Sequence, residues 1–238
     1  MRIGKGFSVI IILFVVVTGL ATAQSAAPEA PTAPRPRLKV AFVVSERFNI
    51  MDFAGPWEVF NVARLPIAGK ERNDWPRLFE IYTVSDATAP IQTGGNQATL
   101  VPSYTFANAP KPDIIVIGAQ DSNTPELFEW LRTQNASGTT LMSVCIGASK
   151  LARAGLLDGK SATTHHGFIA DFQGEFTKTK WLKDLRYVRV TDTIYTSGGL
   201  TSGIDLALHL VAKRFGEGTA TATAEWLEYQ GTGWTQKE

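Results

Sequence analysis

The chain has 238 residues, 44% hydrophobic and 19% charged, so it can bury a substantial core and is not disordered as a whole. Its 23 Lys and Arg residues nearly balance 22 Asp and Glu residues, which leaves no basic excess for binding nucleic acid, and we expect no nucleic-acid partner. One cysteine, Cys145, excludes an internal disulfide framework. With only three histidines beside it, we expect no metal and no other cofactor.

Residues 1–23 are predicted to form a signal peptide. Arg2 and Lys5 precede an apolar stretch over 7–20, and the sequence ATA at 21–23 has the small-x-small pattern of a cleavage site. An uncleaved membrane anchor is the alternative, but the stretch is shorter than the roughly 20 apolar residues that span a bilayer. We therefore expect an exported protein, periplasmic or secreted, without stable membrane insertion after cleavage.

Residues 24–37 hold four prolines among small residues and are predicted to form an extended linker, followed by one domain over 38–238. Apolar runs of strand length predict four strands, at 38–44, 79–84, 113–117 and 140–144. The pattern predicts helices that start near Gly55-Pro56 and that cover 124–134, 148–154, 202–215 and 219–229, with a hairpin at 187–196. This alternation indicates a single flavodoxin-like α/β domain, a mostly parallel sheet with helices on both faces.

Ligands of such sheets bind beyond the carboxyl ends of the strands. The most informative place there is the turn at Cys145, where an apolar strand ends and a helix of small residues begins at once. This is the pattern of a nucleophile elbow, in which Gly147 and Ala148 let the helix pass close to the strand. A helix N-terminus beneath the sulfur would lower the pKa of the thiol below about 8.5. The alternative is a buried cysteine that acts as a small hydrophobic residue.

Several motifs resemble the ThiJ/PfpI family of the class I glutamine amidotransferase-like superfamily. They are SVCIGA at 143–148, LARAGLLDG at 151–159, ATTH at 162–165, SGG at 197–199 and TSGIDLAL at 201–208. The upstream sequence MDFAGPWEVF at 51–60 resembles the isonitrile hydratase branch and the sensor halves of some AraC-type regulators. The resemblance runs from 38 to about 229, and it implies a homodimer.

The resemblance implies that Cys145 is the nucleophile and that Asp52 is the acidic residue facing it. It places an oxyanion hole at the main-chain N–H groups of Ile146 and of Gly118 or Ala119. The residues themselves agree for Asp52, because it follows the first strand and has apolar neighbours that would raise its pKa. A helix-capping or solvated aspartate is the alternative.

One residue departs from the hydratase pattern. Isonitrile hydratases typically have a threonine after the cysteine, and here that position is Ile146, which has no hydroxyl group. Three further residues are candidates for the pocket: His165, Trp57 and Gly199. His165 would orient or protonate a substrate group, or else be a hydrogen-bonded histidine at a strand end. Asp205 and His209 are predicted to form a surface pair one helical turn apart.

The leading hypothesis is an exported, cofactor-free enzyme with a cysteine nucleophile that hydrates or hydrolyses a small molecule, as an isonitrile hydratase does. Cys145 would attack as a thiolate, and Asp52 would supply a proton and then help to activate water. Two alternatives remain. One is a non-catalytic sensor or binding protein for a small molecule, and the other is a protein of oxidative stress that uses the thiol.

Overall fold

The computed structural model describes Met1 and residues 36–236. The predicted signal peptide, apart from Met1, and nearly all of the predicted linker lie outside these residues. Among the residues that are described, no helix is both long and apolar enough to cross a bilayer.

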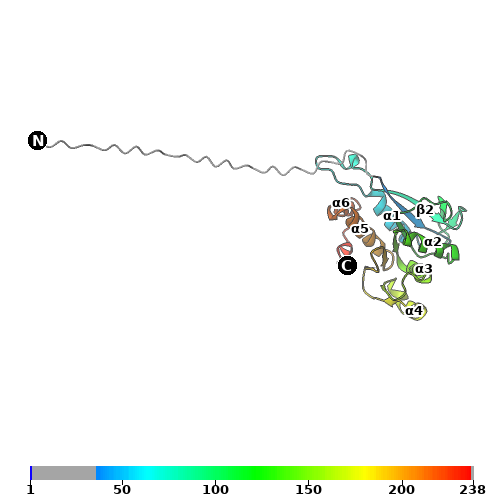
Figure 1. Ribbon diagram of the computed structural model, residues 1–238. Helices are drawn as coiled ribbons and strands as arrows, with labels where there is room; N and C mark the ends of the chain where they lie inside the picture. Colours follow the sequence, from blue (N-terminus) through cyan, green and yellow to red (C-terminus); the bar gives the residue numbers. More distant parts are fainter. Residues whose placement is uncertain (2–35, 237–238) are drawn as a thin grey trace. The chain divides into compact units, whose positions relative to one another are not determined.

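A seven-stranded sheet, in the order β10-β11-β7-β6-β1-β2-β5, forms the centre of the domain (Figure 1). Its strands in chain order are β1 (Leu38–Val43), β2 (Phe79–Ser85), β5 (Tyr104–Thr105), β6 (Ile114–Ile117), β7 (Thr140–Ser143), β10 (Tyr187–Arg189) and β11 (Ile194–Ser197). Neighbouring strands are parallel except β10 and β11, which form the predicted hairpin. Two small sheets pair β3 (Ile91–Gln92) with β4 (Thr99–Leu100) and β8 (Ser161–Ala162) with β9 (Lys180–Trp181). The predicted mostly parallel sheet is confirmed.

Helices cover both faces of the sheet, as predicted (Figure 1). One face carries α1 (Ile50–Val62), α5 (Ser202–Phe215) and α6 (Glu217–Trp226), and the other carries α2 (Pro125–Ala136), α3 (Ala148–Arg153) and α4 (Ile169–Glu175). Short 3₁₀ turns lie at Arg72–Asp74, Cys145–Gly147, His166–Phe168 and Gly233–Thr235. The alternating side chains of the buried strands divide the core into two clusters, one on each face.

Helix α1 begins five residues earlier than the predicted start at Gly55, and this corrects the sequence analysis. The side chain of Asn49 caps the helix by accepting hydrogen bonds from the N–H groups of Met51 (2.9 Å) and Asp52 (3.2 Å). Pro56 therefore lies inside the helix, where its missing N–H leaves the carbonyl of Asp52 without its usual helical donor. As a result, Asp52 lies in the first turn of α1 rather than in a loop before it.

Two further features differ from the predictions. Helix α4 was not predicted, and it packs Phe172 against Trp181 with ring centroids 4.9 Å apart. The predicted surface pair of Asp205 and His209 is wrong, because Asp205 is buried and pairs with Arg186. The Nδ1 atom of His209 instead lies at hydrogen-bond distance, 2.9 Å, from the hydroxyl oxygen of Tyr187.

The order of the strands explains why the candidate residues meet. The chain continues from β1 to β2 on one side, whereas β6 and β7 lie on the other side of β1. Loops that leave the carboxyl ends of such central strands diverge and open a site between them. Asp52 follows β1, Gly118 follows β6 and Cys145 follows β7, so all three lie at this edge.

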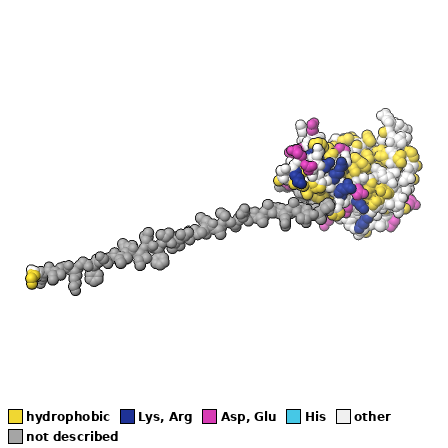
Figure 2. Space-filling model, turned by 90° about the horizontal axis from the view of Figure 1, so that it is seen from above, with side chains coloured by type: hydrophobic (Ala, Val, Ile, Leu, Met, Phe, Trp, Pro, Cys, Tyr) yellow, Lys and Arg dark blue, Asp and Glu magenta, His cyan; other side chains and the backbone are white. Residues whose placement is uncertain are grey.

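The surface carries charges of both signs. Figure 2 shows Lys and Arg side chains beside Asp and Glu side chains, with hydrophobic side chains between them, on the face that it presents. Several ion pairs on the described surface join partly exposed groups, as in the pair of Arg47 and Asp121 at 2.7 Å. Pairs of this kind contribute little to stability, about 0–1 kcal/mol each.

Candidate functional site

Cys145 lies on a strained turn between β7 and α3. Its φ of +57° is in the left-handed region, which non-glycine residues rarely adopt. Two hydrogen bonds hold this backbone: the N–H of Cys145 donates to the carbonyl of Gly198 (2.9 Å), and its carbonyl accepts from the Thr164 hydroxyl (2.9 Å). Strain of this kind collects at functional sites, and the predicted nucleophile elbow is confirmed.

Two glycines allow the turns to approach one another. A Cβ atom on Gly147 would lie 2.2 Å from the carbonyl oxygen of Ile117, so only glycine fits where the elbow crosses the end of β6. A Cβ atom on Gly118 would lie 2.6 Å from the Cβ atom of Asp52. The turns after β1, β6 and β7 can therefore approach one another only because these two positions are glycine, where any side chain would collide.

Asp52 is 1% exposed and lies against the turn after β6. Its Oδ2 atom accepts a hydrogen bond from the N–H of Ala119 (2.9 Å), whereas its Oδ1 atom is buried and has no hydrogen-bond partner. Burial raises the pKa of this carboxyl group, and the hydrogen bond from the N–H of Ala119, together with the nearby N–H of Leu200 and the Cys145 thiol, opposes the rise. The expected rise in the pKa of Asp52 is confirmed.

The thiol of Cys145 contradicts the expectation of a lowered pKa. Cys145 is 6% exposed, and burial together with the charge of Asp52 raises its pKa to about 12. The N–H groups of Ile146 and Leu200 pull the pKa down, but burial and the neighbouring carboxylate outweigh them. Helix α3 has only six residues, so its dipole is small as well. With this raised pKa the thiol is protonated near neutral pH, and the carboxyl group of Asp52 lies beside it.

The three main-chain groups predicted to form an oxyanion hole differ in what they contact. The N–H of Ile146 faces the sulfur, and the N–H of Ala119 is occupied by Asp52, against which Gly118 packs. Leu200 was not predicted as a site residue, yet its N–H lowers the pKa of both the thiol and the carboxyl group. Its φ is +52°, and no sequence motif marks a leucine in that conformation.

His165 and Gly199 lie beside this pair. The Nδ1 atom of His165 accepts a hydrogen bond from the N–H of Gly167 (3.1 Å), so the neutral ring carries its proton on Nε2. A positive charge on His165 lowers the pKa of Asp52, as expected of groups that lie near each other. A Cβ atom on Gly199 would lie 2.1 Å from the His165 ring, so Gly199 leaves room for the imidazole.

Trp57 lies on α1 and is partly buried. Its ring packs on Phe42 and Phe53, with centroids 5.1 and 5.0 Å away, against the core cluster on that face of the sheet.

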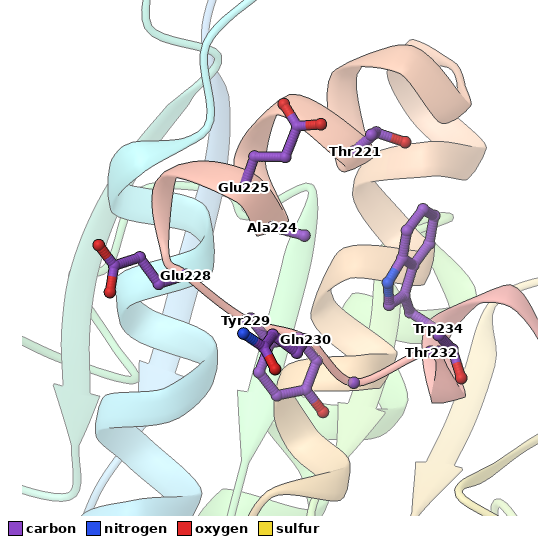
Figure 3. A pocket seen from close by; sticks show the side chains of 9 residues that line it. Thr221, Ala224, Glu225, Glu228, Tyr229, Gln230, Thr232 and Trp234 are labelled. Atoms are coloured by element: carbon purple, nitrogen blue, oxygen red, sulfur yellow. The ribbon is translucent and has the colours of Figure 1, made fainter.

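A cavity of about 530 Å³ lies beside His165 and the 198–201 loop. It is lined by residues that include Thr164, His165, Gly199, Leu200 and Arg186, whereas neither Cys145 nor Asp52 lines it. Its lining residues His165 and Leu200 both lower the pKa of Asp52, and the cavity is large enough for a small molecule. A second cavity of about 450 Å³, between α6 and the C-terminal segment, contains none of the predicted site residues (Figure 3).

The model of the DJ-1/PfpI family matches residues 38–213. The chain belongs to the DJ-1/PfpI family. Its identification as a ThiJ/PfpI protein from the sequence motifs is thereby confirmed.

Curated relatives in this family include both regulators and an enzyme. The transcriptional regulator GbdR of Pseudomonas aeruginosa is 29% identical over 209 residues, which are 86% of this chain and 54% of the regulator. The chain thus spans about half the length of that relative. An isonitrile hydratase of Pseudomonas putida is 28% identical over 200 residues, which are 81% of this chain and 78% of the hydratase.

Solved structures show the same fold. A ThiJ/PfpI family protein from Pseudomonas syringae is 22% identical with a TM-score of 0.69, covering 88% of this chain and 84% of its own. Drosophila melanogaster DJ-1beta is 15% identical with a TM-score of 0.68, covering 82% of this chain and 100% of its own. The domain is therefore a single DJ-1/PfpI flavodoxin-like fold with Cys145 at its elbow.

Proposed function

We propose that this protein is an enzyme that adds water to a small electrophile through Cys145 and Asp52, as in the hydration of an isonitrile to a formamide. The observation that carries the proposal is the buried carboxylate of Asp52, whose Oδ1 atom has no hydrogen-bond partner and which lies beside the only cysteine. A buried, unsatisfied carboxylate costs stability, and such costs are typical of catalytic groups.

The protonated resting thiol determines the order of the steps. Asp52 takes the thiol proton as the sulfur attacks the terminal carbon of the isonitrile, and the proton then passes to that carbon to give a thioimidate, R–N=CH–S–Cys. Asp52 next deprotonates a water molecule that adds to the same carbon, while the nitrogen gains a proton. The C–S bond breaks, the thiol regains its proton, and R–NH–CHO leaves.

Neighbouring groups have defined parts in this proposal. The N–H groups of Ile146 and Leu200 stabilise charge that develops near the sulfur and the attacked carbon. His165, through Nε2–H, orients the substrate from the side of the 530 Å³ cavity. Ile146 offers no hydroxyl group, so Asp52 must activate the water without help from the side chain that follows the cysteine.

A panel of alkyl and aryl isonitriles, with detection of the formamide, tests this proposal. We expect turnover by the wild type, none by Cys145→Ala, and faster turnover by Ile146→Thr, which restores the hydroxyl of the hydratase pattern. Absence of formamide from every isonitrile, with the thiol intact by mass spectrometry, would contradict the hydratase reaction. If activity appears only in Ile146→Thr, the fold and its reactive groups can support hydration, but isonitrile hydration is not the reaction of the wild type.

A sensor or binding protein is the second candidate function. The low exposure of Cys145 and its raised pKa favour it, as does the similarity to GbdR over 86% of this chain. A sensor would keep its ligand affinity in Cys145→Ala and show no turnover in any variant. The same raised pKa weighs against thiol oxidation, which requires an accessible thiolate.

We further propose export to the periplasm or the medium, on the pattern of residues 1–23, and a small-molecule substrate without a nucleic-acid partner. N-terminal sequencing of exported material should begin near Gln24. Recovery of the intact chain from membranes would favour an anchor instead.

A further inference from the structure

The loop of residues 198–201 touches the candidate nucleophile at two points. The carbonyl of Gly198 accepts the hydrogen bond from the N–H of Cys145, and the N–H of Leu200 lies near enough to lower the pKa of both the thiol and Asp52. The positive φ values of Cys145 and Leu200 are strained, so surrounding contacts must hold the loop in place.

Arg186 forms hydrogen bonds to both ends of this loop. Its carbonyl accepts a hydrogen bond from the N–H of Gly198 (3.0 Å), and its Nη2 atom donates to the hydroxyl of Thr201 (3.2 Å). Gly199 and Leu200 lie between these two attachment points. One residue thus fixes both ends of the segment that carries the Leu200 N–H.

Arg186 is itself held by the buried carboxylate of Asp205 in α5. The Nε atom of Arg186 donates to Oδ2 of Asp205 (2.5 Å), and the hydroxyl of Tyr229 donates to Oδ1 (3.0 Å). Tyr229 lies on the segment that follows α6 (Figure 3), and a Cβ atom on Gly233 of that segment would lie 2.6 Å from Oδ2 of Asp205. Tyr229 and Gly233 lie beyond residues 38–213, which the family model matches.

We propose that Arg186, braced by Asp205 and Tyr229, is a positioning residue that holds the 198–201 loop against Cys145. The proposal deepens the proposed function, because it concerns the same thiol. It implies that the C-terminal segment, through Tyr229, helps to align the reactive groups. An unbroken series of contacts carries it, from Tyr229 through Asp205 and Arg186 to Gly198 and the N–H of Cys145.

The single cysteine permits a direct test. Labelling with [¹⁵N]cysteine identifies the one Cys145 amide signal, which reports the hydrogen bond between Cys145 and Gly198, and uniform ¹⁵N labelling shows the amides of β6 beside it. We expect Tyr229→Phe and Arg186→Lys to speed hydrogen exchange of this amide by about tenfold, as for loss of one such bond, while amides of β6 keep their rates. Tyr195→Phe is the control: Tyr195 is fully buried whereas Tyr229 is partly buried, but the hydroxyl of Tyr195 has no hydrogen-bond partner, so its removal should leave the exchange rate of the Cys145 amide unchanged.

Two results would overturn the proposal. One is an unchanged exchange rate of the Cys145 amide in Tyr229→Phe, a variant that carries the test even where Arg186→Lys fails to fold. The other is equal acceleration at Cys145 and in β6, which would show a purely structural role. With a substrate in hand, kcat should fall about tenfold in Tyr229→Phe while KM stays within about twofold. The exchange measurement needs no substrate, so its failure is distinct from failure of the isonitrile panel.

Discussion

Asp52 and Asp205 have the same side chain and the same environment by several measures. Each is 1% exposed, and each lies in the first turn of a helix on the same face of the sheet. Both oxygens of Asp205 have donors, from Arg186 and Tyr229, whereas Oδ1 of Asp52 has none and a thiol lies beside it. The partners of a buried carboxylate, rather than its burial, thus separate a structural residue from a reactive one.

The difference has an energetic basis. A buried carboxylate that is paired and fully hydrogen-bonded recovers the cost of leaving water, and removal of one partner is strongly destabilising. A carboxylate left partly unsatisfied is held in place by the rest of the fold and keeps a raised pKa, which suits proton transfer near neutral pH. Four predictions test this comparison.

The largest effect should be on turnover. Asp52→Asn keeps the shape of the side chain but cannot accept a proton, so kcat should fall by about 1,000-fold, and Cys145→Ala should remove at least as much. Because the two residues act on one proton, the double variant should be little worse than Cys145→Ala alone. Independent, multiplicative losses in steady-state kinetics would refute a shared pathway.

The next effect should be on stability at the other carboxylate. Asp205→Asn leaves Arg186 without its anionic partner, and we expect the free energy of unfolding to fall by about 2–3 kcal/mol. Urea denaturation followed by circular dichroism measures this loss. A change below about 0.5 kcal/mol would mean that the Arg186 pair contributes no more than an exposed ion pair.

At Asp52 the same substitution should have the opposite sign. Because the pKa of Asp52 is higher in the folded chain than in the unfolded one, its contribution to stability is full below about pH 4 and is lost as the pH rises through the folded pKa. Asp52→Asn abolishes that loss, so at pH 7 the variant should be more stable than the wild type. Urea midpoints at pH 4 and pH 7 test the sign, and a less stable variant at pH 7 would contradict it.

The last effect concerns a buried cation. Lys150 is 4% exposed, its Nζ atom donates to Oδ1 of Asn123 (3.0 Å), and burial lowers its pKa to about 8. The folded chain releases this proton before the unfolded chain does, so Lys150 should make stability rise between pH 8 and about 10.4. Lys150→Met should lose that rise in thermal unfolding across this range. If stability still rises by the same amount in Lys150→Met, other titratable groups cause the rise.

Much of the fold follows from local patterns in the sequence. The short apolar runs of β1, β2, β6 and β7 are too short for helices, and Thr124 with Pro125 marks the start of α2. The start of α1 was misplaced because Pro56 is a strong signal for a first turn, whereas here the side chain of Asn49 caps the helix seven residues earlier.

The candidate site was predictable only in part. The Gly147 and Ala148 pattern after Cys145 identified the elbow, and the position of Asp52 after β1 placed it at the same edge. The pKa of Cys145 was not predictable, because it depends on burial and on the charge of a residue 93 positions away in the sequence. Leu200 was missed because a main-chain N–H has no sequence signature.

The central claim is that Cys145 rests as a neutral thiol under the control of Asp52. Selective [3-¹³C]cysteine labelling gives one Cβ signal, whose chemical shift separates thiol from thiolate. We predict a thiol shift in the wild type from pH 6 to about 10, and titration at lower pH in Asp52→Asn, because the carboxylate charge that raises the pKa of the thiol is gone. A thiolate shift at pH 7 in the wild type, or the same titration in both proteins, would contradict the account.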